Sequence, residues 1–103
     1  MPITLCCLLW ATPGNRSALH VYEDAVLELL HDHDAMLVQR AVSDDDETPD
    51  EVQLYEIRSQ AALDGYLTDP RRLAREDERN RVVARTVLFP VTFRPGAPAP
   101  GLT

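Results

Sequence analysis

The chain has 103 residues, of which 45% are hydrophobic and 26% are charged, a composition typical of a soluble globular domain. This length suits one domain and excludes a two-domain enzyme with a separate cofactor module. Its basic residues are ten arginines and no lysine, against seventeen acidic residues, so the net charge is −7 and nucleic acid is not an expected partner.

The first predicted element is a strand over residues 3–10. Both of its alternating sets, Ile3/Leu5/Cys7/Leu9 and Thr4/Cys6/Leu8/Trp10, are mostly apolar, which indicates a strand covered on both faces. The adjacent Cys6 and Cys7 point to opposite faces and are expected to be buried free thiols. The apolar run is too short for a membrane span and lacks a basic segment before it, so we expect a cytoplasmic protein with no membrane partner.

A helix and two further strands follow in chain order. Apolar residues recur at helical spacing from Leu19 to Leu30, which predicts an amphipathic helix with Ser17 as its N-cap. A second strand is predicted over 34–43 and a third over 52–58. The charged turn between them, which includes four consecutive acids (Asp44 to Glu47), is expected to lie in solvent.

The second half of the chain begins with two helix-start signals. Ser59 is expected to cap a short helix, and Asp69 followed by Pro70 to start another. The helix over 71–82 has oppositely charged residues at helical spacing, such as Arg72 with Glu76, and is expected to lie on the surface. A last strand is predicted over 83–93, and the Pro/Gly-rich residues 94–103 are expected to form a flexible tail.

The predicted order of strand, helix, strand, strand, helix pair and strand favours an α+β fold of the ferredoxin-like type over residues 1–93, with an antiparallel sheet. In this arrangement all helices lie on one face of the sheet. Because the strands carry apolar residues on both faces, a single copy would expose an apolar sheet face. We therefore expect a homodimer formed through that face.

Residues 50–71 contain the pattern S-x-x-A-L-D-x-Y-L-x-D-P, which starts at Ser59. This stretch resembles the third strand and second helix of the dimeric α+β barrel superfamily, whose members include antibiotic-biosynthesis monooxygenases, isomerases and many families of unknown activity. The resemblance implies a homodimer whose two sheets face each other and often enclose a cleft for an apolar ligand.

Three residues are candidates for ligand binding: Arg40, Tyr55 and Trp10. A guanidinium within an apolar strand must reach solvent, pair with an acid or face a cavity. Arg40 is therefore expected either to look into the open face and bind a carboxylate or phenolate, or to pair with an acid such as Glu56. The rings of Tyr55 and Trp10 would either form an aromatic wall of the ligand cleft or belong to the core.

No metal site or cofactor is predicted. His20 and His31 share a helix face, but eleven residues of helix separate them by roughly 16 Å, too far for one ion. The acidic run lacks the ligand spacing of a calcium loop.

Three functional hypotheses remain at this point. The first is a homodimer that binds a small apolar or aromatic metabolite on the open sheet face. The second is a cofactor-independent monooxygenase or isomerase acting on an aromatic or polyketide-like substrate, with Arg40 positioning an anion and Tyr55 donating a proton. The third is a structural module whose cleft is filled by its own side chains.

Overall fold

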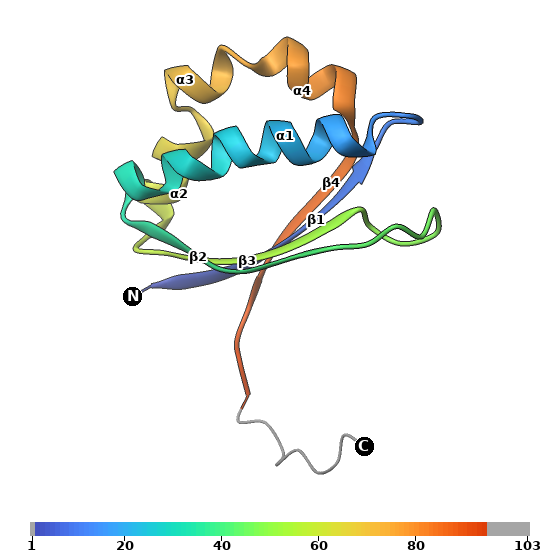
Figure 1. Ribbon diagram of the computed structural model, residues 1–103. Coiled ribbons are helices and arrows are strands. Elements are labelled where there is room, and N and C mark those ends of the chain that lie inside the picture. The colour runs from blue at the N-terminus through green and yellow to red at the C-terminus, as the bar shows by residue number, and fades with distance from the viewer. Residues whose placement is uncertain (1, 95–103) are drawn as a thin grey trace.

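The computed structural model describes residues 2–94 of the chain (Figure 1). The tail expected over 94–103 lies, from residue 95 onward, outside the described residues. In chain order the elements are β1 (Ile3–Ala11), α1 (Arg16–Leu27), the 3₁₀ helix η1 (Glu28–His33), β2 (Ala35–Val42), β3 (Glu51–Ile57), α2 (Gln60–Leu67), α3 (Pro70–Leu73), α4 (Glu76–Val82) and β4 (Val83–Val91).

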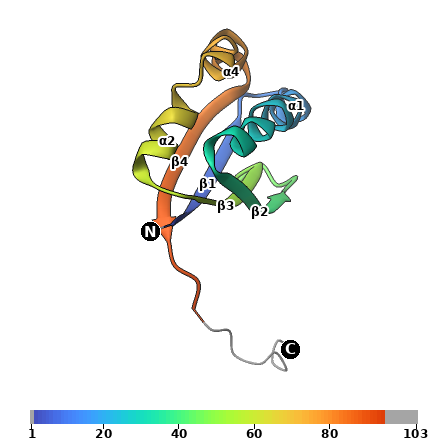
Figure 2. The ribbon, with the colours of Figure 1, turned by 90° about the vertical axis from the view of Figure 1, so that its left-hand side faces the viewer.

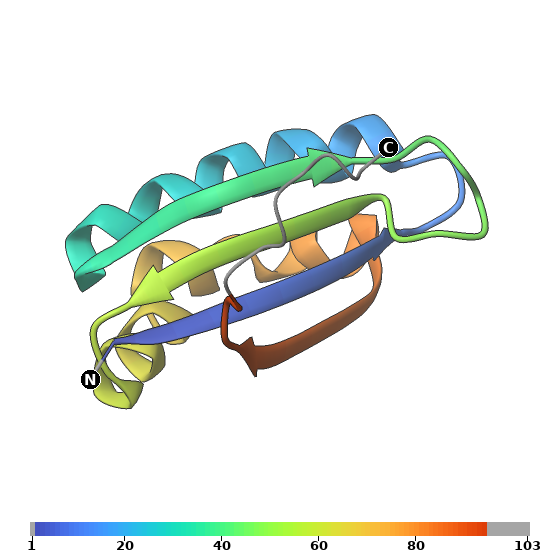
Figure 3. The ribbon, with the colours of Figure 1, turned by 90° about the horizontal axis from the view of Figure 1, so that it is seen from below.

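The four strands form one sheet in the order β2–β3–β1–β4, and every neighbouring pair is antiparallel. The helices all lie on one face of this sheet (Figures 1 and 2). Figure 3 looks at the other face, which no helix within residues 2–94 covers. This order of elements and strands is the ferredoxin-like α+β fold, so the predicted fold is confirmed.

Two of the three predicted helix starts are confirmed. The Ser59 hydroxyl accepts a hydrogen bond from the Ala62 amide at 3.1 Å, and the Asp69 carboxylate accepts one from the Arg71 amide at 2.8 Å. Such bonds satisfy amides that have no partner within the helix. The prediction for Ser17 was wrong. Helix α1 begins one residue earlier, after Asn15, whose side chain donates to the Thr12 hydroxyl instead of capping the helix.

The core lies between the sheet and the helices. The β1 residues Leu5, Cys7 and Leu9 face the helices, and none is more than 7% exposed. Leu19 and Val26 of α1 are fully buried in the same core cluster. Each large apolar side chain buried in this way contributes about 1.5–3 kcal/mol to folding. The apolar residues at every second position of β1 are therefore the main reason why the sheet packs against the helices.

The opposite sheet face, which we call the open face, is also apolar, as predicted. In register, Leu8 lies between Val52 and Val87, and Cys6 lies between Leu54 and Phe89. Phe89 is 37% exposed. The chain therefore presents a row of apolar side chains on a surface that lacks a covering layer within the described residues.

The helices of residues 2–94 are too short or too polar to span a bilayer.

Candidate functional site

Trp10 lies at the end of β1 on the open face, opposite Arg85 of β4. The Arg85 guanidinium carbon is 4.5 Å from the centre of the indole ring, a cation–π contact. Trp10 also lines a pocket of about 570 Å³ where β1 turns toward α1. The other lining residues are Ala11, Thr12, Pro13, Gly14, Arg16, Ser17, Asp46 and Asp50.

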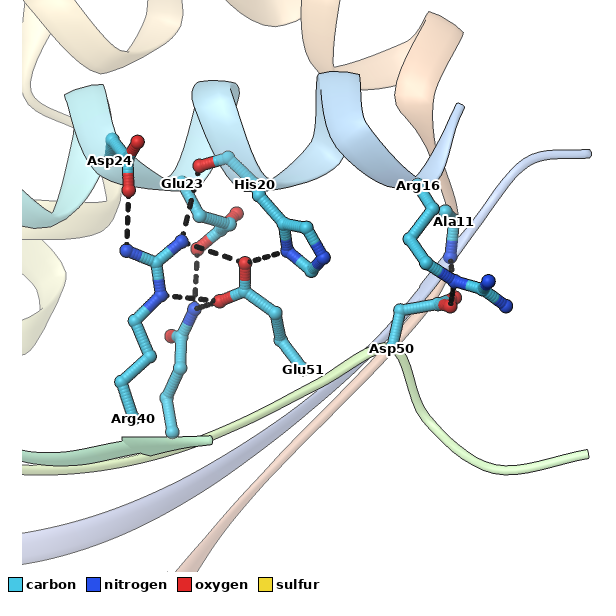
Figure 4. A network of polar contacts seen from close by, with 9 residues as sticks. Ala11, Arg16, His20, Glu23, Asp24, Arg40, Asp50 and Glu51 are labelled. Carbon is cyan, nitrogen blue, oxygen red and sulfur yellow. Dashed lines mark hydrogen bonds and ion pairs between the residues drawn. The ribbon is translucent and has the colours of Figure 1, made fainter. Parts of the chain in front are cut away.

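The charged groups of this pocket are paired with one another. Arg16 donates to Asp50 at 2.6 Å, and Asp50 also accepts from the Ala11 amide at 2.7 Å (Figure 4). Arg16 donates to Asp46 as well, at 2.9 Å. Burial acts to raise the pKa of Asp50, but the hydrogen bonds from Ala11 and Arg16 outweigh it and lower the pKa. Since these charges are already neutralised, the indole ring and Pro13 are the surfaces that the pocket offers to a ligand.

Arg40 points to the helices and not to the open face. A shift in the β2–β3 register between Leu37 and Gln39 places Arg40 opposite Gln53 on the helix-covered side. There its guanidinium donates to both carboxylate oxygens of Glu51, at 2.8 and 2.7 Å, and to Asp24 of α1 (Figure 4). The expectation that Arg40 pairs with an acid is confirmed, but the partner is Glu51 and not Glu56. Glu56 lies on the other face of its strand.

Glu51 is the centre of a buried polar network beneath α1. It is fully shielded from solvent, and besides Arg40 it contacts His20 Nδ1 at 2.5 Å and accepts from Gln53 at 2.9 Å. Burial alone would raise the pKa of Glu51, but the bonds from Arg40, Gln53 and His20 hold it below the ordinary value. The carboxylate is thus ionised, and His20 Nδ1 carries the proton that it donates.

Glu23 is the second buried acid of this network. It accepts a hydrogen bond from Gln53 at 2.8 Å and is 5% exposed. Burial raises its pKa, and the bond from Gln53 only partly compensates. Glu23 and Glu51 thus share one amide donor while their pKa values shift in opposite directions.

Tyr55 is also on the helix side of the sheet and is 3% exposed. Its ring packs edge-on against Tyr66, with centroids 6.3 Å apart, and burial raises the pKa of its hydroxyl. The structure therefore does not bring the three candidate ligand residues together: Trp10 is on the open face, and Arg40 and Tyr55 lie beneath the helices. A ligand role for each stays a prediction.

Sequence reasoning missed Arg72. The segment 71–82 lies largely on the surface, as predicted, but Arg72 is half-buried and does not pair with Glu76, because its guanidinium carbon sits 5.0 Å from the centre of the buried Tyr66 ring. Helix α3 exposes its apolar Leu73 by 50% and turns Arg72 inward. This arrangement inverts the usual pattern, so the hydrophobic periodicity of the sequence contains no signal for it.

Within residues 2–94 no three histidine, cysteine, aspartate or glutamate side chains gather closely enough to hold a metal ion. His33 contacts Asp69 at 2.7 Å and so joins η1 to the start of α3.

Comparison with family models and with curated proteins gave no match. Solved structures with the same fold include a NIPSNAP family protein of unknown function from Agrobacterium tumefaciens, with 14% identity, a TM-score of 0.75, and coverage of 94% of this chain and 92% of that one. A dimeric ferredoxin-like protein of unknown function from Bacteroides fragilis has 11% identity and a TM-score of 0.67 over 89% and 96% of the two chains.

A provisionally named antibiotic biosynthesis monooxygenase from Chloroflexus aurantiacus has 19% identity and a TM-score of 0.58 over 93% and 98% of the two chains. The comparisons confirm the predicted fold: the chain has a ferredoxin-like α+β fold. At these identities the likeness establishes the fold alone.

Proposed function

We propose that this protein is a homodimer, joined through its open sheet face, that binds a small apolar or aromatic molecule beside Trp10. The observation that carries the proposal is the apolar open face itself, on which Cys6, Leu8, Leu54 and Phe89 are neighbours in register. Monomeric proteins rarely leave an apolar patch of several hundred Å² uncovered.

Energetics support a second copy as the cover. At about 25 cal/mol per Å², covering several hundred Å² of apolar surface on each of two copies contributes on the order of 10 kcal/mol before association costs. A two-fold dimer uses the same patch on both copies, so one apolar face is sufficient. The related fold from Bacteroides fragilis is described as dimeric.

The pocket beside Trp10 supports the ligand. Its volume of about 570 Å³ falls in the range of small-molecule sites, about 300–1,000 Å³. It lies next to the open face, so the partner copy would close its rim. An aromatic ring stacked on the indole would meet Pro13 and the paired, neutralised charges of Arg16 and Asp50.

Sedimentation equilibrium at micromolar concentration tests the dimer. The wild-type chain is expected at twice its monomer mass, and Leu54→Asp, which places a charge in the centre of the open face, at the monomer mass. The control is Val21→Asp on α1, a position that is 63% exposed and away from the sheet. A wild-type monomer with an intact fold contradicts the proposal.

Calorimetric titration with 2-naphthol, a neutral aromatic probe, tests the ligand pocket. Trp10→Ala is expected to weaken binding by at least about tenfold, because stacking on an aromatic ring contributes about 0.5–1.5 kcal/mol beyond the area that it buries. Val21→Ala, at an exposed position of α1 that does not line the pocket, is the control and should bind as the wild type does. Equal affinity in the wild type and Trp10→Ala removes this pocket from the proposal.

The second candidate is a cofactor-independent monooxygenase, which the likeness to the Chloroflexus aurantiacus protein favours. Aerobic incubation with a panel of hydroquinones, followed by oxygen uptake, tests it. If Tyr55 donates a proton in that reaction, Tyr55→Phe lowers the uptake rate while the chain keeps its fold. Uptake at the wild-type rate in this variant would remove that role from Tyr55.

A further inference from the structure

Two polar atoms in the interior have no hydrogen-bond partner among the described residues: the Tyr22 hydroxyl and Arg72 Nε. Tyr22 is 1% exposed. Buried polar atoms in folded proteins are nearly always paired with protein, water or ligand. Two such donors in one small region therefore point to a partner that residues 2–94 do not supply.

The two orphaned donors belong to one region, between α1 and the start of α3. Arg72 lies over the Tyr66 ring at 5.0 Å, and the Tyr66 hydroxyl donates to the Val26 carbonyl at 3.2 Å. Val26 is one helical turn beyond Tyr22 on the same face of α1. Burial raises the pKa of Tyr22, and the positive charge of Arg72 acts in the opposite direction, as expected if Arg72 lies near the Tyr22 hydroxyl.

Arg72 is also short of a counter-charge. Among residues 2–94 it forms no ion pair within 4 Å, unlike its neighbour Arg71, which contacts both Asp32 and Asp69. The buried acid that acts on Arg72 electrostatically is Glu23, which is already hydrogen-bonded to Gln53. A half-buried guanidinium that lacks a hydrogen-bonded anion keeps part of its desolvation cost, and an anionic ligand would reduce that cost.

We infer that Arg72 and Tyr22 form a receptor for the carboxylate group of a small organic acid, on the helix side of the sheet. One carboxylate oxygen accepts from Arg72 Nε and from the Tyr22 hydroxyl. A monocarboxylate fits better than a phosphate, because the surroundings are apolar and aromatic and a second negative charge has no further cation to meet. This site does not depend on the proposed dimer or on the Trp10 pocket, which lies where the end of β1 turns toward α1 and is lined by neither Tyr22 nor Arg72.

A groove of about 570 Å³ lies beside this region, and its lining includes Ala25 and Arg71, the sequence neighbours of Val26 and Arg72. It runs between α1 and α3 and is lined by Ala25, Glu28, Leu29, Arg71, Ala74 and Arg75.

The experiment uses the full chain, with sodium benzoate as the probe at constant ionic strength. The ¹H–¹⁵N NMR signal of Arg72 Nε–H is followed during the titration, and benzamide serves as the neutral probe of the same shape. A saturable shift of the Arg72 signal with benzoate, and none with benzamide, is expected. Binding of both probes alike, or no shift at all, would overturn the inference.

Tyr22→Phe tests the second donor. Because the Tyr22 hydroxyl is unpaired, its loss is expected to leave the thermal midpoint of the free protein unchanged or higher, while benzoate affinity falls at least about tenfold, the effect of one hydrogen bond to a charged group. Val21→Ala, at the exposed neighbouring position on α1, is the control, since it leaves Tyr22, Tyr66 and Arg72 unchanged. Benzoate should bind this control as it binds the wild type.

Unchanged benzoate affinity in Tyr22→Phe would overturn the inference. So would a crystal structure grown with benzoate in which a water molecule alone occupies the space between the two donors. Neither result bears on the dimer, which sedimentation tests separately.

Discussion

Arg40 on β2 holds Glu51 on β3 through two parallel hydrogen bonds, Nε to Oε1 at 2.8 Å and Nη2 to Oε2 at 2.7 Å, and Glu51 is completely shielded from solvent. The same guanidinium reaches Asp24 and the His20 carbonyl of α1. This pair thus ties the edge of the sheet to the long helix above it. The bidentate geometry is the strongest form that such a pair takes.

Removing one partner of this pair should leave an uncompensated charge in the interior. We expect Arg40→Ala to lower the free energy of unfolding by about 3–5 kcal/mol, measured by urea denaturation. Asp24→Asn is the matched control: Asp24 is mostly exposed, so its loss should cost less than about 1 kcal/mol. A loss below about 1 kcal/mol for Arg40→Ala would show that the buried pair contributes little to stability.

Glu23 should make the fold less stable as the pH rises, whereas most carboxylates in folded proteins have the opposite effect. Its pKa is raised by burial, so the folded state binds the proton more tightly than the unfolded state does. Glu23 is therefore neutral and without penalty below its unfolded pKa, and it destabilises the fold as the pH rises through its folded pKa. Glu23→Gln keeps an oxygen for the bond from Gln53 and should be more stable than the wild type at pH 8.

The comparison needs thermal midpoints of both proteins across the pH range. The advantage of Glu23→Gln should shrink as the pH falls and vanish at about pH 4, near the ordinary pKa of a glutamate. An advantage that does not change with pH would mean that the charge of Glu23 is not the cause.

Cys6 and Cys7 should differ in their response to dimer dissociation. Cys7 faces the helices, and burial raises its pKa to about 12, so it should stay inert to iodoacetamide at pH 8. Cys6 lies on the open face between Leu54 and Phe89. In the Leu54→Asp variant, alkylation of Cys6 is expected to accelerate relative to the wild type while that of Cys7 is unchanged, as measured by mass spectrometry of the peptides.

The control for this measurement is Val21→Asp, which keeps the open face intact and should alkylate at wild-type rates. If Cys7 reacts together with Cys6, the substitution has loosened the whole core. In that case the faster reaction of Cys6 would not report on the interface.

The elements that could be predicted from the sequence depend on local physics. Ser59 and Asp69 cap helices because their side chains reach amides two or three residues away, and the chain order of the elements limits the sheet to few arrangements. The charged turn around Asp45 and Glu47 is exposed, as like charges in sequence require. Self-association, the ligand and the cytoplasmic location stay predictions.

The candidate site was harder to predict because one irregularity changed its geometry. Strict alternation places Arg40 on the face opposite to Leu37, but the register shift before Gln39 adds one residue and returns Arg40 to the face that Leu37 shares. Alternation in the sequence cannot reveal such a bulge. The sequence also placed Glu51 in the turn before the third strand. Its burial depends on contacts with Arg40 of β2 and His20 of α1, which are distant from it along the chain.

By itself the sequence determined the order of the elements, their caps and the apolar character of both sheet faces, because each follows from residues that are near neighbours along the chain. Only the tertiary structure decided where the charged side chains end. Arg40 and Arg72 both turn inward, toward Glu51 and Tyr66, since a long guanidinium takes the direction in which distant elements supply an acid or an aromatic ring.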